Sequence, residues 1–193
     1  MSSPSMLGKW DLWYRGIKTM GSFKYGDTIT YRLAAAFLAD MPAVEDWGCG
    51  TGGFKRFFQG EYLGLDGSAN PFVDKVVDLR EYRSHVDGLI MRHVLEHNYD
   101  WRQVLENALA SFNKKFCLII FTPFAAETRE IAHNKKYGVD VPDLSFSQAE
   151  LEAFFVGLKW RKEIHRTRTA HRQETIYFLE KSPHHQTLYQ SRP

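Results

Sequence analysis

The stretch that decides the fold runs from Val44 to Gly53 and reads Val-Glu-Asp-Trp-Gly-Cys-Gly-Thr-Gly-Gly. An apolar segment, 43–47, leads into these glycines, so the pattern predicts a strand followed by a tight turn. Glycine adopts backbone angles that other residues avoid, and it lets a ligand lie directly against the main chain. Gly48, Gly50 and Gly53 also meet the pattern G-x-G-x-x-G, which leaves a dinucleotide ligand open at this point.

The rest of the chain alternates short apolar segments with helical patterns. One helix is predicted over 100–112, with Asp100 as its N-cap, and another over 147–156, where Ser147 and Glu150 form a capping box. Strands are predicted at 43–47, 62–65, 72–77, 86–91, 116–122, 160–168 and 175–180. Such alternation implies an α/β fold with a parallel sheet covered on both faces, and the last two strands add an antiparallel edge.

Composition and charge limit the classes of protein to which the chain can belong. The chain has 193 residues, of which 44% are apolar and 15% aromatic, so it fits one folded domain and excludes disorder for most of its length. The net charge of +2 is too small to indicate a nucleic-acid partner. No segment approaches the ~18 consecutive apolar residues of a membrane helix. With Cys49 and Cys117 as the only cysteines, we expect a reducing cytoplasm and no thiolate metal site.

Three carboxylates lie around the glycine loop at the ends of successive predicted strands, Asp46 before it and Asp66 and Asp78 after it. Asp46 would repel a pyrophosphate, but it suits a ligand such as S-adenosylmethionine, which carries an ammonium group and a cationic sulfur without phosphate. Asp66 ends the next strand and can accept hydrogen bonds from both ribose hydroxyls. Asp78 can accept one from the adenine amino group, with the Leu79 backbone beside it. These acids together favour S-adenosylmethionine over a nicotinamide dinucleotide.

These motifs resemble those of class I S-adenosylmethionine-dependent methyltransferases. The matching segments are Asp46–Gly52, Leu65-Asp66, Val77-Asp78 and Met91–His97. The last segment is similar to the motif after the fourth strand in the ubiquinone/menaquinone-biosynthesis-like branch. The resemblance implies a Rossmann-like, seven-stranded, mostly parallel sheet with helices on both faces and a C-terminal antiparallel hairpin. It leaves the acceptor open, because that branch methylates quinones, sugars, lipids and other metabolites.

A set of site residues follows from the motifs and the resemblance. The predicted cofactor-binding residues are Asp46, Gly48, Cys49, Gly50, Gly52, Asp66, Gly67, Asp78, Leu79 and Arg92. Arg92 either meets the methionine carboxylate or forms a surface ion pair. His93 is the candidate general base, since imidazole titrates near neutral pH, and the alternative is a structural histidine bonded to a main-chain carbonyl. His97 is the other catalytic candidate, although it and Glu96 are expected mainly to fix the loop. No metal ligands are predicted.

We expect one methyltransferase domain over 1–181 and a polar tail over 182–193. Within the domain, 1–42 forms an N-terminal cap, 43–122 the cofactor-binding half, and 123–146 an insertion on the substrate side. The cap either closes over the cofactor or packs as a helix on the sheet edge; its aromatic residues are Trp10, Trp13, Tyr14, Phe23 and Tyr25. The insertion suits a polar or anionic acceptor through Arg129, His133, Lys135, Lys136 and Tyr137. The basic segment 159–172 is interpreted as a solvated edge rather than a nucleic-acid surface.

The sequence therefore predicts methyl transfer from S-adenosylmethionine to a small polar metabolite, such as a saccharide or a natural-product hydroxyl or amine. Met91–Val94 stands where enzymes that methylate nucleobase amines carry Asp/Asn-Pro-Pro-aromatic, which argues against such substrates. The alternatives are a non-catalytic, cofactor-binding partner subunit and a nicotinamide-dependent oxidoreductase. The sequence does not specify the oligomeric state.

Overall fold

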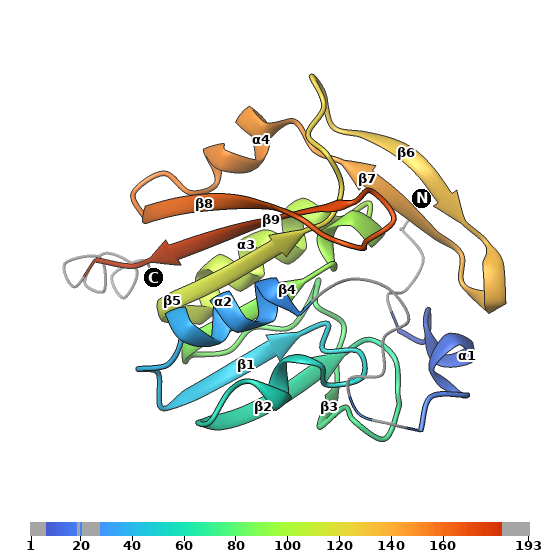
Figure 1. Cartoon of the computed structure of the whole chain (residues 1–193), viewed down its shortest axis with the longest axis horizontal. Coiled ribbons are helices and arrows are strands. Elements are labelled where there is room, and N and C mark those ends of the chain that lie inside the picture. Colours follow the sequence, from blue (N-terminus) through green and yellow to red (C-terminus); the bar gives the residue numbers. More distant parts are fainter. Residues whose placement is uncertain (1–6, 19, 21–27, 183–193) are drawn as a thin grey trace.

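The computed structural model describes residues 7–18, 20 and 28–182. Its centre is a seven-stranded sheet in the order β3-β2-β1-β4-β5-β9-β8 (Figure 1). The parallel strands are β1 (Ala43–Trp47), β2 (Glu61–Asp66), β3 (Lys75–Val76), β4 (Val86–Arg92) and β5 (Phe112–Ile120). The antiparallel strands are β8 (Lys159–Arg166) and β9 (Gln173–Glu180). The predicted Rossmann-like fold with its C-terminal antiparallel hairpin is confirmed.

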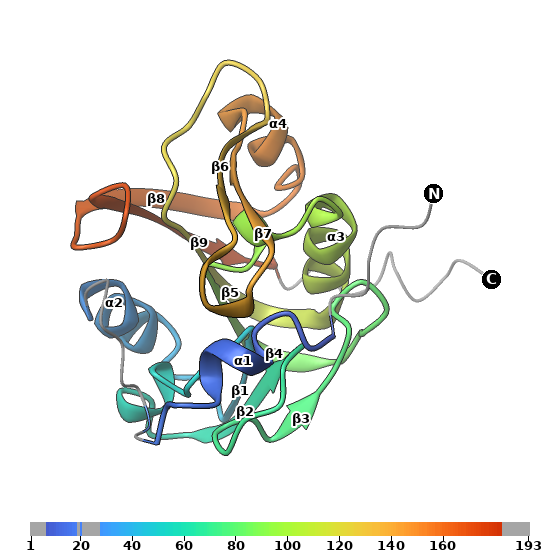
Figure 2. The same ribbon diagram turned by 90° about the vertical axis from the view of Figure 1, so that its right-hand side faces the viewer.

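Helices cover both faces of this sheet, and the strand sequence shows which side chains reach each helix. Successive side chains of a strand point to opposite faces. In β4, Leu89 and Met91 join the core beneath α3 (Trp101–Ser111) and α4 (Gln148–Ala153). Ile90, between them, joins the core beneath α2 (Ile29–Phe37) (Figure 2). A strand buried on both faces therefore reads as one continuous apolar run.

The predicted helix starts are confirmed only in part. Ser147 caps α4, because its hydroxyl accepts a hydrogen bond from the Glu150 backbone N–H at 3.4 Å. The Glu150 carboxylate does not complete the predicted box, since it binds Thr128 and Arg102 instead. Asp100 occupies the N-cap position of α3 but makes no side-chain cap bond; its carboxylate accepts from Arg80 at 3.2 Å.

The boundary between α3 and β5 also differs from the prediction. The helix ends at Ser111 and the strand begins at Phe112, four residues before the predicted Phe116. Phe112 is fully buried and satisfies the helical spacing of the preceding apolar residues as well as the strand pattern. Sequence periodicity cannot separate the two elements at such a junction.

The predicted insertion contains a small sheet of its own. Its strands are β6 (Arg129–Asn134) and β7 (Val141–Ser145), which pair antiparallel and are joined by the short helix η3 (Lys136–Gly138). The tip of this hairpin meets α1 (Asp11–Tyr14) beyond the carboxyl ends of the parallel strands (Figure 2). The fit is close, since a methyl group on Gly138 would lie 2.3 Å from Leu12 Cδ1.

Some predictions fall outside the described residues. These are the roles of Phe23 and Tyr25 in the cap and the polar tail beyond Ser182. Within the part of the chain that the structure describes, no helix has the length and apolar character needed to cross a membrane.

Candidate active site

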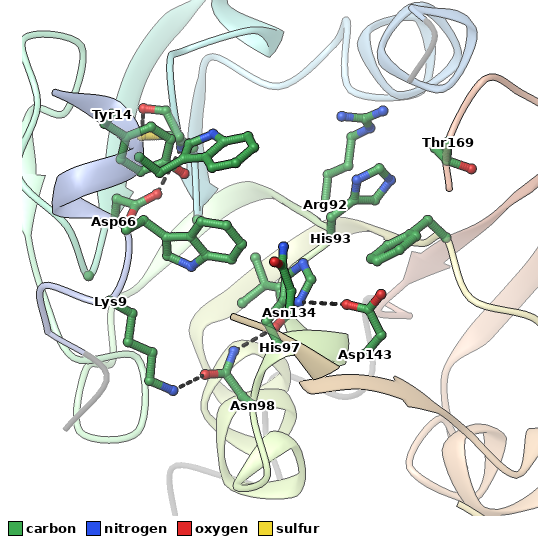
Figure 3. A pocket seen from close by; sticks show the side chains of 18 of the residues that line it. Lys9, Tyr14, Asp66, Arg92, His93, His97, Asn98, Asn134, Asp143 and Thr169 are labelled. Carbon is green, nitrogen blue, oxygen red and sulfur yellow. Dashed lines mark hydrogen bonds and ion pairs between the residues drawn. The ribbon is translucent and has the colours of Figure 1, made fainter. Parts of the chain in front are cut away.

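A cavity of about 450 Å³ lies at the carboxyl ends of the parallel strands (Figure 3). Its floor is formed by the glycine loop and by the residues that follow β2 and β4. Its walls come from α1, from the β6–β7 hairpin and from the loop between β8 and β9. The residues that line it include Trp10, Trp13, Tyr14, Tyr31, Gly48, Cys49, Gly50, Asp66, Gly67, Leu79, Arg92, His93, His97, Phe121, Lys136, Asp143, Arg168 and Thr169.

The glycine loop turns through left-handed backbone conformations. Gly48 has φ +74° and Gly50 has φ +54°, which side chains other than glycine rarely adopt. A methyl group on Gly48 would lie 2.2 Å from Val94 Cγ2, so the loop packs directly on the segment after β4. Gly52 has the same type of conformation at φ +70°, but it lies outside the cavity lining, near Met20.

Asp66, at the end of β2, fixes this loop from behind. Its carboxylate accepts hydrogen bonds from the Gly50 and Ser68 backbone N–H groups, both at 2.9 Å. Burial raises the pKa of Asp66 to about 6, although the backbone hydrogen bonds act in the opposite direction. Asp66 and Gly67 both line the cavity, so the predicted ribose-binding position lies at the cavity wall.

The other two predicted carboxylates lie outside the cavity lining. Asp46 is buried and accepts a hydrogen bond from the Tyr62 hydroxyl at 2.9 Å, and burial raises its pKa to about 7. Asp78 forms an ion pair with Arg80 at 2.7 Å. Leu79, next to it, does line the cavity. The structure thus brings Asp66, and not all three acids, to the cavity surface.

Arg92 ends β4 in a buried ion pair, so of its two predicted alternatives the surface ion pair is wrong. Its guanidinium lies 2.6 Å from the Glu174 carboxylate and stacks over the Tyr31 ring at 4.4 Å. The side chain is only 7% exposed, yet Arg92 and Tyr31 both contribute to the cavity lining.

His93 lies at the cavity, and its imidazole ring is hydrogen-bonded to a carboxylate. Its Nε2 lies 2.6 Å from Glu174 Oε1, which replaces the main-chain carbonyl considered as its alternative partner. The Phe121 ring packs against the imidazole, with the ring centres 4.7 Å apart. Burial, together with the charge of Arg92, lowers the pKa of His93 to about 4. The imidazole is therefore neutral at pH 7.

His97 connects the helix η2 (Leu95–His97) to the hairpin. Its Nδ1 donates to the Pro142 carbonyl at 2.9 Å and lies 3.3 Å from the Asp143 carboxylate. Burial opposes protonation of this ring, but the hydrogen bonds with Asp143 and Pro142 and the charges of Glu96 and Asp143 together outweigh it and raise the pKa of His97. Trp10 packs edge-on against the ring at 5.1 Å between centres. These contacts agree with a role in fixing the loop.

The N-terminal aromatic residues form a wall of the cavity. Trp10, Trp13 and Tyr14 all line it, and a methyl group on Gly50 would lie 3.1 Å from the Tyr14 hydroxyl. The Trp10 backbone N–H donates to the Ser68 hydroxyl at 2.8 Å, which ties this segment to the loop after β2. The alternative of a helix on the sheet edge is wrong, because α1 lies across the carboxyl ends of the strands (Figure 2).

Several lining residues were missed by the sequence reasoning, and some predicted ones lie elsewhere. Arg168 and Thr169 reach the cavity from the β8–β9 loop, a contact that only the tertiary fold creates. From the insertion, Lys136 lines the cavity, while His133 binds Glu130 and Asp140 on the exposed side. Arg129 and Lys135 are not among the lining residues, and the Tyr137 side chain lies outside the described part. No group of metal-ligating side chains occurs among the residues described.

Comparisons with known proteins support the fold. No protein-family model matches the chain, and no curated protein matches it. Solved structures do. Magnesium protoporphyrin IX methyltransferase from Synechocystis with bound SAH is similar over 80% of this chain and 83% of its own, with 15% identity and a TM-score of 0.57.

Two further solved structures give the same result. A putative S-adenosylmethionine-dependent methyltransferase from Listeria monocytogenes matches over 79% of this chain and 98% of its own, with 12% identity and a TM-score of 0.55. The N-terminal domain of EvdMO1, solved with SAH and D-fucose, matches over 79% of this chain and 82% of its own, with 14% identity and a TM-score of 0.55. At these identities the similarity establishes a shared fold.

Proposed function

We propose that this protein is a class I methyltransferase that uses S-adenosylmethionine and acts on a small polar metabolite. The observation that carries the proposal is the cavity built on the left-handed Gly48–Gly50 turn, with the Asp66 carboxylate at its edge. Open α/β sheets bind ligands at the carboxyl ends of their strands, where this cavity lies. Solved structures of the same fold that carry SAH support the assignment.

The residues at the cavity fit this cofactor. Its volume of about 450 Å³ lies within the usual range for small-molecule sites. Bound S-adenosylmethionine supplies a methyl group already activated on a cationic sulfur. The aromatic walls include Trp10, Trp13 and Tyr14, residue types whose ring faces favour a cation. We also propose that the chain belongs to the ubiquinone/menaquinone-biosynthesis-like branch of these methyltransferases.

Each lining group has a proposed task. The bare backbone of Gly48 and Gly50 lets the cofactor approach the main chain, with Cys49 between them. Both Asp66 oxygens already accept a backbone N–H, and because a carboxylate has about four lone-pair sites, Asp66 retains acceptor capacity for a ribose hydroxyl. Leu79 offers an apolar contact to adenine, and Arg92 a charge for the methionine carboxylate. The aromatic cap and the hairpin exclude water around the acceptor.

Calorimetry with S-adenosylhomocysteine (SAH) and NAD tests the cofactor assignment. We expect SAH to bind the purified chain and NAD to give no heat. Asp66→Asn removes a charged acceptor, so the affinity for SAH should fall by about 10–100-fold, or roughly 1.5–3 kcal/mol. Asp74→Asn is the matched control, because Asp74 also accepts a backbone N–H, from Gly64 at 2.7 Å, but lies outside the cavity lining.

Three outcomes would decide against this proposal. Binding of NAD without SAH would favour the oxidoreductase alternative. Equal losses of SAH affinity in Asp66→Asn and Asp74→Asn would show that the effect passes through stability alone. A non-catalytic partner subunit would bind SAH normally but form no methylated product when labelled S-adenosylmethionine is incubated with a metabolite extract.

Cys49 and Cys117 are both buried free thiols, which supports the proposed location of the protein in a reducing cytoplasm.

A further inference from the structure

His93 is held in an unusual backbone conformation at the end of β4. Its φ of +58° lies in the left-handed region, which residues other than glycine rarely adopt. Its backbone N–H donates to the Ile119 carbonyl at 3.0 Å, so the strand pairing continues up to this residue. The turn thus occurs at His93 itself, and its ring lines the cavity. Such strained residues persist where the surrounding structure holds them, often at functional sites.

Glu174 is the group that holds the His93 ring. Its side chain is fully buried, and its Oε1 lies 2.6 Å from His93 Nε2. The same oxygen lies 2.6 Å from the Arg92 guanidinium, and Oε2 accepts from the Thr30 hydroxyl at 3.2 Å. Burial opposes ionisation, but the hydrogen bond from His93 and the charge of Arg92 outweigh it and lower the pKa of Glu174. The carboxylate is therefore a fixed anion.

This contact decides which ring nitrogen of His93 carries the proton. An ionised carboxylate only accepts hydrogen bonds, so the neutral imidazole must keep its proton on Nε2. Nδ1 then has a free lone pair. The described residues make no hydrogen bond to Nδ1, and it is not among their fully buried unpaired atoms, so it remains open to the cavity.

We infer that Glu174 is a positioning residue for methyl transfer to a hydroxyl: it fixes His93 with Nδ1 facing the acceptor. The inference rests on the proposed function. An acceptor oxygen forms a bond to the methyl carbon as the carbon–sulfur bond breaks, and the electron pair of that bond stays on sulfur. The hydroxyl proton passes to His93 Nδ1. The Glu174 carboxylate stabilises the imidazolium that results, and SAH leaves uncharged at sulfur.

The charges around His93 favour a hydroxyl over an amine acceptor. Burial and the charges of Arg92 and His97 lower the pKa of His93, and Glu174 raises it. The net effect is a lowered pKa, so the ring is a weak base that carries no extra proton at neutral pH. An alkylamine has a pKa near that of lysine, about 10, and must lose its proton before it attacks. Transfer of that proton to a ring whose pKa is lowered is unfavourable. A hydroxyl attacks in its neutral form and becomes strongly acidic as the methyl group arrives, so a weak base suffices.

Nitrogen-15 spectra of the full chain labelled at histidine test the inference. In the wild-type protein at pH 7, the His93 signal should show a protonated Nε2 and an unprotonated Nδ1. Glu174→Gln should increase the minor, Nδ1-protonated form at least tenfold. Glu130→Gln is the matched control, since it removes a carboxylate from an exposed histidine, His133, and should leave the His93 signal unchanged. The wild-type spectrum is the primary measurement, because Glu174→Gln leaves Arg92 buried without its anion.

Distinct results would overturn the inference and the proposed function. A proton on Nδ1 in the wild-type protein, or a His93 signal unaltered by Glu174→Gln, would reject the positioning role. Absence of signal changes on adding SAH would reject the proposed function instead. Labelled S-adenosylmethionine incubated with a metabolite extract should give a methyl ether, at a rate at least tenfold lower in Glu174→Gln. A methylamine product would overturn the assignment of a hydroxyl acceptor.

Discussion

The Glu96→Gln substitution should make the stability of this protein less dependent on pH. The Glu96 side chain is fully buried in η2. Its Oε1 accepts a hydrogen bond from the Phe121 backbone N–H at 2.6 Å, and Oε2 has no partner among the described residues. Burial raises the pKa of Glu96 from 4.5 to about 7, although the charge of His97 acts in the opposite direction. The folded protein therefore binds this proton more tightly than the unfolded chain.

The sign and size of the effect follow from this difference. The contribution of Glu96 to the free energy of unfolding is complete below about pH 4.5 and is lost as the pH rises through about 7. A shift of roughly 2.5 pKa units corresponds to at most about 3 kcal/mol. Glutamine retains the oxygen that binds Phe121 and does not titrate. Its unpaired amide adds a constant cost of about 1–3 kcal/mol at every pH.

Denaturant unfolding at pH 5, 6, 7 and 8 measures this prediction. The difference in free energy of unfolding between wild type and Glu96→Gln should change by up to about 3 kcal/mol between pH 5 and pH 8, in favour of the variant at the higher pH. For a chain of this length, that corresponds to roughly 6–12 °C in melting temperature. Glu130→Gln, at an exposed position, should show a far smaller change. A pH-independent difference for Glu96→Gln would refute the reasoning.

Three further outcomes are expected. Ser147→Ala removes the cap of α4 and should lower the free energy of unfolding by about 1 kcal/mol, and an unchanged value would contradict the observed cap. Gly138→Ala places a methyl group against Leu12 in a left-handed conformation, so amide exchange over 7–18 should speed up; unaltered exchange would show that the hairpin does not hold this segment. SAH should slow amide exchange in α1 and the β6–β7 hairpin, and equal rates with and without it would argue against closure over the ligand.

The sequence by itself determined the succession of the seven strands of the central sheet along the chain and the glycine turn, but not the two strands of the β6–β7 hairpin. The reason is local: Gly48 and Gly50 need left-handed backbone angles, and the apolar run in β4 reflects burial on both of its faces. It also located Asp66 at the end of β2, because an acid directly after a strand has a fixed place at the carboxyl edge of a parallel sheet. Ser147 was recognisable as a cap from its position ahead of the helical pattern.

Only the tertiary structure decided which of these groups meet. Asp46 and Asp78 follow the same strand-end pattern as Asp66, but packing gives them Tyr62 and Arg80 as partners away from the cavity lining. Glu174 stands at the start of an apolar strand, where it reads as an ordinary edge residue.

Its contact with His93 joins groups 81 positions apart in the chain, because β9 runs antiparallel beside β5 and brings its start to the carboxyl edge of β4 and β5. The β6–β7 hairpin closes over the same edge through His97 and Asp143. Such contacts depend on how strands pair over long distances, and no local pattern encodes them.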